Sequence, residues 1–244
     1  MGLSGLRVNP EQAPAFMLGG RGVDSTGRFT SSPLELPTAS KAHFLQPTRI
    51  AATPNGYLVV GLETYADYSL RRTSGNLVTT DLSKASKAII YESSFSEHAF
   101  AADAAWEGKT GYTLFGRRVN DSKTSGYFRK INAAGKPAAA AKKFPPNKAP
   151  NTCNYRIIPL TGTGWFATTW YDYSQELMYL QILSSKGTFM GSPVPISENA
   201  YRILDDVVDM AWDAASQRIL VAYAEYAAAP STPEDIWVAI FSLE

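Results

Sequence analysis

Two adjacent stretches decide the fold: Asn154-Tyr-Arg-Ile-Ile-Pro-Leu-Thr-Gly-Thr-Gly-Trp-Phe-Ala-Thr-Thr-Trp170 and Leu177-Met-Tyr-Leu-Gln-Ile-Leu-Ser-Ser-Lys-Gly187. The first holds two apolar runs separated by a turn-forming Thr-Gly-Thr-Gly sequence, and the second holds a third run that ends in a polar turn. A fourth run follows in Thr188-Phe-Met-Gly-Ser-Pro-Val-Pro-Ile196. Short runs rich in aromatic and β-branched residues, each bounded by turn residues, predict four consecutive β-strands.

The same pattern recurs along the chain at a nearly constant step. The second run of each unit begins at Tyr57, Tyr112, Trp165 and Ile219, so the steps are 55, 53 and 54 residues. Four antiparallel strands per unit of this length are typical of a β-propeller blade. We therefore predict an all-β fold, a β-propeller of four-stranded antiparallel blades, about four to five in number. A β-sandwich is the alternative, but it offers no reason for so regular a period.

The repeat boundaries predict a single domain with incomplete ends. We expect one β-propeller domain over residues 1–244, with a partial unit at 16–48 and units at about 49–99, 100–153, 154–207 and 208–244. The last unit stops before a fourth run, whereas the N-terminal unit offers a third and a fourth run. Because soluble proteins rarely leave a strand edge exposed, we expect residues 30–36 to pair beside residues 236–243, within one chain or between two. The alternatives are a piece of a longer propeller or a differently assigned N-terminal run.

Five pieces of these units carry a family resemblance. They are Tyr57-Leu-Val-Val60, Ile219-Leu-Val-Ala-Tyr223, Asp235-Ile-Trp-Val238, Leu183-Ser-Ser-Lys-Gly187 and Pro195-Ile-Ser197. Together they resemble a bacterial β-propeller repeat that reads, loosely, Tyr-Leu-Val-Val-Trp-x-Asp, Asp-Ile-Tyr/Trp, Ser-Ala-Asp-Gly and a proline-bearing last strand. The resemblance covers residues 16–244 and weakens where Arg117 and Arg118 replace the acidic position. It implies a propeller fold and often an extracellular setting, and it transfers no catalytic residue.

Composition narrows the classes of function. The chain has 23 Lys+Arg and 22 Asp+Glu, a net charge of +1, so we expect no nucleic-acid partner. With Cys153 as the single cysteine and no ligand motif, we expect no internal disulfide, no metal and no cofactor. The apolar runs are too short to span a bilayer, and no intact secretory signal is present. The sequence does not determine the cellular location of the protein. A secreted or cell-surface location, with the signal peptide removed, fits the resemblance.

Candidate binding residues gather between the second and third runs of the units. In three of the four units this stretch is aromatic and acidic. An aromatic ring beside a carboxylate suits sugars, because the ring packs on C–H groups and the carboxylate accepts hydroxyl hydrogen bonds. The candidate ligand-binding residues are Trp170, Tyr171, Asp172, Tyr173, Glu63, Tyr65, Tyr68, Arg117, Arg118, Glu225 and Tyr226. The alternative is that these aromatic rings fill the blade interiors.

This repetition favours a non-enzymatic binding module over an enzyme. Repeated sites suit repeated ligands, so we expect a lectin-like module that recognises a glycan or a protein partner through one face of the propeller. Self-association through the incomplete ring is a further expectation. The alternative is a glycoside hydrolase or lyase that uses carboxylates at the central channel. No catalytic residue is assigned, since the chain has only two histidines and no Gly-x-Ser-x-Gly nucleophile motif.

Overall fold

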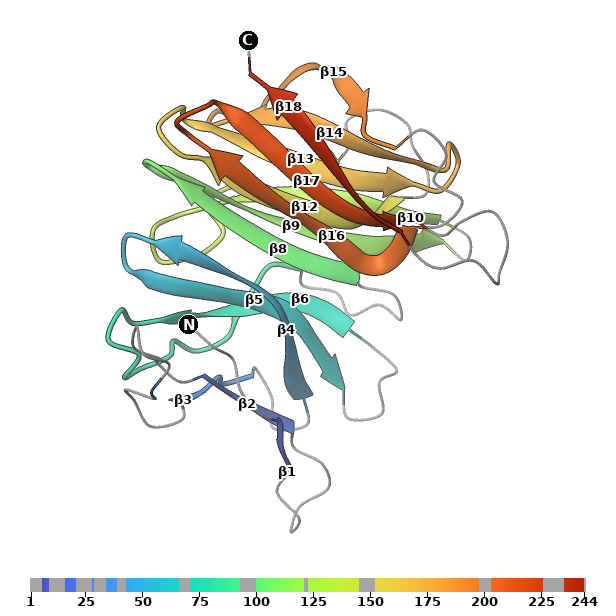
Figure 1. Cartoon of the computed structure of the whole chain (residues 1–244). Helices are drawn as coiled ribbons and strands as arrows, with labels where there is room; N and C mark the ends of the chain where they lie inside the picture. Colours follow the sequence, from blue (N-terminus) through green and yellow to red (C-terminus); the bar gives the residue numbers. More distant parts are fainter. Residues whose placement is uncertain are drawn as a thin grey trace.

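Five antiparallel β-sheets make up the described chain (Figure 1). The computed structural model describes residues 6–8, 16–20, 28, 34–38, 43–65, 71–92, 100–120, 123–144, 152–197, 203–225 and 235–243. These residues form eighteen strands and no helix. Among them there is no helix long and apolar enough to cross a membrane. The predicted all-β propeller of four-stranded antiparallel blades, about four to five in number, is confirmed.

The three central sheets are complete, whereas the two terminal sheets have three strands each. The second sheet contains β4 (His43–Thr53), β5 (Gly56–Tyr65), β6 (Arg71–Val78) and β7 (Ile89–Ile90). The third contains β8 (Phe100–Glu107), β9 (Thr110–Asn120), β10 (Lys123–Ile131) and β11 (Lys142–Phe144). The fourth contains β12 (Thr152–Leu160), β13 (Trp165–Asp172), β14 (Leu177–Ser184) and β15 (Phe189–Pro195). The first contains β1 (Leu6–Val8), β2 (Phe16–Gly20) and β3 (Leu34–Glu35), and the fifth β16 (Ile203–Asp213), β17 (Arg218–Glu225) and β18 (Asp235–Ser242).

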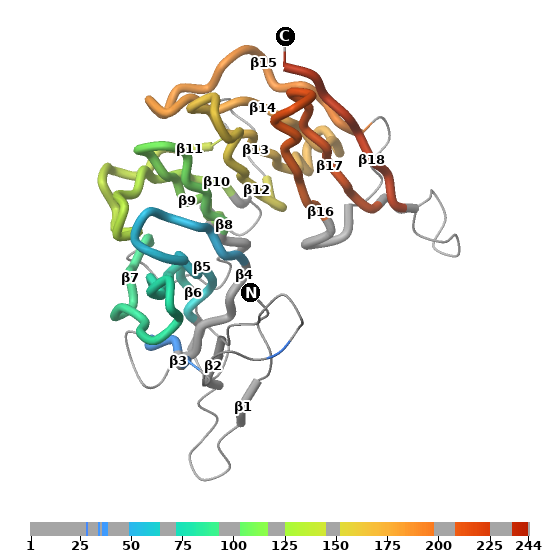
Figure 2. Tube along the Cα trace, turned by 60° about the vertical axis from the view of Figure 1, so that its left-hand side comes forward, coloured from blue at the N-terminus to red at the C-terminus, as the bar shows by residue number. Residues whose placement is uncertain are grey.

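Neighbouring sheets pack face to face around their first strands. Strands β4, β8, β12 and β16 contact one another in succession, and the second to fifth sheets follow an arc in Figure 2. Each contact buries an apolar cluster, which is the main source of stability in such a fold. Tyrosine hydroxyls add links between sheets: Tyr91 donates to the Gly135 carbonyl at 2.7 Å, and Tyr112 donates to the Ser185 carbonyl at 2.9 Å.

The two ends of the chain do not pair as expected. Strand β3 pairs with β2, and β18 pairs with β17 alone among the described strands. The expectation that residues up to Leu36 complete the last sheet within one chain is therefore wrong for Leu34 and Glu35, while residues 30–33 lie outside the described ones. A partner nearby in sequence costs less loop-closure entropy than one two hundred residues away, and this favours the local pairing.

Gly126 allows the third and fourth sheets to approach closely, and this yields a stability prediction. A Cβ at Gly126 would lie 2.6 Å from the Tyr155 ring and 2.7 Å from the Phe144 carbonyl oxygen. We expect Gly126→Ala to lower the free energy of unfolding by about 1–3 kcal/mol, because a buried ring and a backbone strand must both move. Urea unfolding of the two proteins measures the difference, and an unchanged midpoint would contradict the close packing.

Candidate functional site

Most candidate binding residues lie at the ends of second strands and not in loops. Glu63 and Tyr65 lie in β5, Arg117 and Arg118 in β9, Trp170 to Asp172 in β13, and Glu225 in β17. The second strands extend this far because residues of the neighbouring first strand still pair with them, as Thr152 of β12 does with Asp172 of β13. Tyr68 and Tyr226 lie outside the described residues, as do the side chains of Tyr65, Arg117, Arg118 and Glu225.

The candidates of the fourth sheet divide into buried and exposed side chains. Trp170 is 2% exposed and packs between the third and fourth sheets, where its ring lies 4.9 Å from that of Phe144. Tyr171 points to the opposite face and packs against the fifth sheet. Tyr173 is 44% exposed in the turn that follows β13. The described packing thus agrees with the interior role for Trp170 and Tyr171, and ligand binding by this group stays a prediction.

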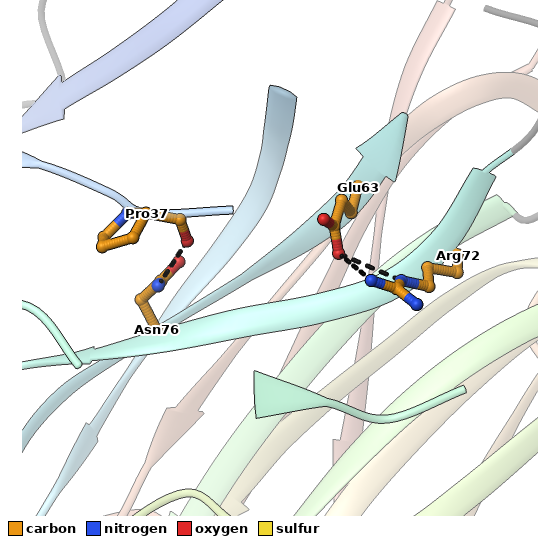
Figure 3. Close-up of polar contacts among 4 residues, drawn as sticks. All are labelled: Pro37, Glu63, Arg72 and Asn76. Atoms are coloured by element: carbon orange, nitrogen blue, oxygen red, sulfur yellow. Dashed lines mark hydrogen bonds and ion pairs between the residues drawn. The ribbon is translucent and has the colours of Figure 1, made fainter. Parts of the chain in front are cut away.

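Glu63 is held inside the second sheet by an ion pair (Figure 3). Its carboxylate is fully buried and accepts hydrogen bonds from the Arg72 guanidinium at 3.0 Å, through both Nε and Nη2. On the same sheet, the Asn76 amide donates to the Pro37 carbonyl at 2.9 Å and ties the preceding segment to β6. Removing either partner would leave an uncompensated buried charge, so Glu63 serves the fold in this arrangement.

A charged residue recurs at one position of the first strands, and the repeating pattern of apolar runs does not reveal it. Arg49, Asp103, Arg156 and Asp209 follow one another at steps of 54, 53 and 53 residues, with alternating sign. They lie in β4, β8, β12 and β16, the strands that pack together along the inner side of the sheets. Asp103 and Arg156 are 4% and 3% exposed, whereas Asp209 is exposed. The constant step is the signal that identifies these residues from sequence.

Within this set, the Asp103 carboxyl has a pKa that is shifted from its ordinary value. Its Oδ1 accepts a hydrogen bond from the Ala104 amide at 2.7 Å, and its Oδ2 accepts one from the Ile157 amide at 3.0 Å, which joins β8 to β12. Burial raises the pKa of Asp103 to about 6, although these hydrogen bonds and the charges of Arg156 and Arg49 act in the opposite direction. Desolvation therefore outweighs the favourable contacts, and this carboxyl can hold a proton near neutral pH.

Arg156 continues the same chain of contacts into the fifth sheet. Its Nε donates to the Val208 carbonyl at 2.8 Å, and its Nη1 donates to the Tyr155 carbonyl at 3.0 Å. The guanidinium thus meets two backbone acceptors and lies close enough to Asp103 to lower the pKa of that carboxyl. Charged groups that are both buried and hydrogen-bonded in this way concentrate at functional sites as well as at structural junctions.

Asp103 and Asp172 lie on the same interface, between the third and fourth sheets. Asp103 reaches β12 through its bond to Ile157. Asp172 shares the face of β13 that carries Trp170, since alternate residues of a strand point to one side. Tyr179 lies on that face, and its pKa is raised first by burial and second by the charge of Asp172. The Asp172 carboxylate is 5% exposed and accepts hydrogen bonds from Ser174, at 2.8 Å from N and 2.6 Å from Oγ.

Metal ligands are not clustered in the part of the chain that the structure describes. No group of three or more His, Cys, Asp or Glu side chains there is arranged to hold a metal ion.

Comparisons with known proteins identify structural relatives only. No protein-family model matches the chain, and no curated protein matches it. An α-L-arabinanase from Penicillium chrysogenum complexed with arabinobiose is 12% identical, with a TM-score of 0.56 over 97% of this chain and 75% of that one. An endo-arabinase from Bacteroides thetaiotaomicron is 14% identical, with a TM-score of 0.53 over 84% and 77%. A thermostable family-43 glycoside hydrolase is 10% identical, with a TM-score of 0.50 over 81% and 71%.

These similarities correct the function expected from sequence. All three relatives are glycoside hydrolases, so the preference for a lectin-like, non-enzymatic binding module is wrong and the alternative of a glycoside hydrolase is better supported. Trp170 and Tyr171, whose aromatic side chains favoured a ligand surface, are packed between sheets. The likeness supports a β-propeller, and it does not extend to the bacterial repeat family named above.

Proposed function

We propose that this protein is a glycoside hydrolase that acts on a polysaccharide containing arabinose. The observation that carries the proposal is Asp103, a buried carboxyl on the inner side of the sheets whose pKa is raised to about 6. Its support is the fold shared with three glycoside hydrolases, of which two are an endo-arabinase and an arabinanase complexed with arabinobiose. The substrate class rests on those two relatives.

The proposed chemistry uses two carboxyl groups in different protonation states. Glycoside cleavage needs one carboxylic acid that protonates the leaving oxygen and one carboxylate that acts as base or nucleophile. Asp103 suits the first role, because a pKa near 6 lets it hold and release a proton close to neutral pH. Asp172 suits the second role, since Ser174 orients its carboxylate through two hydrogen bonds to Oδ1.

Release of reducing sugar from linear arabinan tests this proposal. We expect the wild-type protein to hydrolyse the polymer and both Asp103→Asn and Asp172→Asn to lose at least about 100-fold in kcat, because each removes one half of the acid–base pair. Asp213→Asn is the matched control: Asp213 is the exposed last residue of β16, and the variant should retain activity. Thermal melting must show that each variant is folded.

Two results would overturn the proposal. One is a folded wild-type protein that cleaves neither arabinan nor arabino-oligosaccharides. The other is full activity in the folded Asp103→Asn and Asp172→Asn variants, which would show that hydrolysis uses other groups.

A further inference from the structure

Charge is unevenly distributed over the sheets of this nearly neutral chain. Residues 100–144, which span the third sheet, contain nine basic and three acidic residues, whereas residues 203–243, which span the fifth, contain one basic and seven acidic residues. The whole chain has a net charge of only +1. Positive charge is therefore concentrated on one sheet, and such a concentration creates a local potential that attracts anions even when the net charge is small.

The positive charge collects at the outer edge of the third sheet. Residues 125–144 hold no acidic residue and five basic ones, which we call the basic edge: Arg129, Lys130, Lys136, Lys142 and Lys143. The first two lie in β10, and the last two lie in the edge strand β11 that pairs with β10. Lys136 lies in the connection between these two strands. The basic edge is thus formed by one continuous stretch of the chain.

The charges of the basic edge are accessible and are not neutralised. The lysines of β11 and of the connection are exposed, and the two basic residues of β10 are partly exposed. None of the five forms an ion pair with a described carboxylate, unlike Arg72, which pairs with Glu63. Arg129 in addition has a buried Nε without a hydrogen-bond partner among the described residues. An anionic partner would compensate charge that the described part of the fold leaves uncompensated.

Protection of an exposed strand edge does not account for this set of residues. Lysines on an edge strand do hinder pairing with another chain. The edge strand β15 of the fourth sheet, however, is protected by Pro193 and Pro195 and carries no charge. Moreover, Arg129 and Lys130 lie in β10, which has a neighbouring strand on each side, so their charges protect no edge.

We propose that the basic edge binds an acidic polysaccharide, a polymer whose carboxylates recur along its length. Arginine is the residue of choice for recognising phosphate and nucleic acids, but four of the five basic residues here are lysines. Single-stranded nucleic acids also need aromatic rings on which bases stack. Tyr127, which pairs with Lys143, is already stacked on Phe115, with ring centroids 5.9 Å apart. Both features favour a polysaccharide over a nucleic acid.

The basic edge lies apart from Asp103, the acid of the proposed hydrolysis. The strand order β11-β10-β9-β8 puts three strand spacings between β11 and β8, the strand that carries Asp103. At about 4.8 Å per spacing, these two strands are about 14 Å apart. The inference therefore goes beyond the proposed function: the edge anchors the protein to an acidic polymer without occupying the position of Asp103.

Binding to polygalacturonate, a linear polymer of uronic acid, tests the proposal on the full chain. We expect calorimetry to detect binding in about 50 mM NaCl, and we expect the affinity to fall about 10-fold when NaCl rises to about 200 mM, because contacts with a polyanion release its counterions. The double variant Lys142→Glu with Lys143→Glu should bind at least about 30-fold more weakly at the lower salt concentration, since two attractive contacts become repulsive.

Lys84→Glu combined with Lys186→Glu is the matched control. Both lysines are exposed in connections of other sheets, so this double variant has the same net charge as the β11 variant. Its affinity for polygalacturonate should stay within about threefold of the wild-type value, because charges distant from the contact are screened by salt. Circular dichroism should show that both double variants are folded. Hydrolysis of linear arabinan, which carries no charge, should be the same in both.

Three results would overturn the proposal. The first is a folded wild-type protein that does not bind polygalacturonate at the lower salt concentration. The second is an equal loss of affinity in the two double variants, which would assign binding to net charge and not to the basic edge. The third is tighter binding of a DNA duplex than of polygalacturonate at the same salt concentration, which would make the partner a nucleic acid. None of these results depends on hydrolysis, so this proposal and the proposed function stand or fall separately.

Discussion

Replacing Trp170 by alanine is expected to lower the free energy of unfolding by about 3–5 kcal/mol. Trp170 is 2% exposed, and its indole stacks on Tyr179 with a centroid distance of 5.6 Å while meeting Phe144 edge-on at 4.9 Å. Phe144 belongs to the third sheet, so the indole links two sheets as well as two strands of its own. Removing it leaves a cavity that surrounding backbone, fixed by strand pairing, cannot fill.

Tyr173 supplies the matched control for this substitution. It follows Trp170 by three residues but is 44% exposed, and its ring meets only that of Tyr171, at 5.1 Å, among the described aromatic contacts. We expect Tyr173→Ala to cost less than about 1 kcal/mol. Guanidinium unfolding of both variants measures the difference. If Trp170→Ala unfolds at the wild-type midpoint, the indole does not carry the packing between these sheets.

The sheets could be predicted from sequence because each repeats one local pattern. The starts of the second runs at Tyr57, Tyr112, Trp165 and Ile219 fall at or within two residues of the starts of β5, β9, β13 and β17. Alternating apolar residues and turn residues act within a single unit, so no knowledge of the neighbouring units is needed. The ends of the second strands were harder to predict. Trp170 to Asp172 look like a loop by composition, and pairing with both neighbouring strands, β12 and β14, keeps them in a strand.

The candidate site could not be predicted in the same way, because it is made by contacts between sheets. Asp103 appears in the sequence as an isolated acid within an alanine-rich run, and such a residue is normally solvated. Its burial arises only when β12 brings the Ile157 amide and the Arg156 guanidinium against it. Glu63 is a similar case, since its partner Arg72 lies on the neighbouring strand β6. The sequence places Asp172 among the candidate ligand-binding residues, and its role stays a prediction.

Lowering the pH from 7 to 4 is expected to stabilise the wild-type protein relative to Asp103→Asn by about 2 kcal/mol, most of the full contribution of this carboxyl. Burial raises the pKa of Asp103 from 3.8 to about 6 in the folded protein. The folded state therefore binds more protons than the unfolded state between these two values, and stability falls as the pH rises through them. The contribution of Asp103 is fully present below pH 3.8 and is lost as the pH passes 6. A shift of about two pKa units corresponds to about 3 kcal/mol.

The Asn variant isolates this contribution, because it keeps one acceptor oxygen for the Ala104 or Ile157 amide and does not titrate. The free energies of unfolding of the two proteins should be measured at pH 4, 5, 6 and 7, so that all other carboxyl groups cancel in the difference. We expect the difference to move in favour of Asn as the pH rises, with its steepest change between pH 4 and 6. A difference that stays constant over this range would mean that Asp103 is ionised throughout, held by Arg156 and Arg49. The same result would remove the proton that the proposed hydrolysis requires, so the unfolding measurement also tests the assignment of Asp103 as the acid.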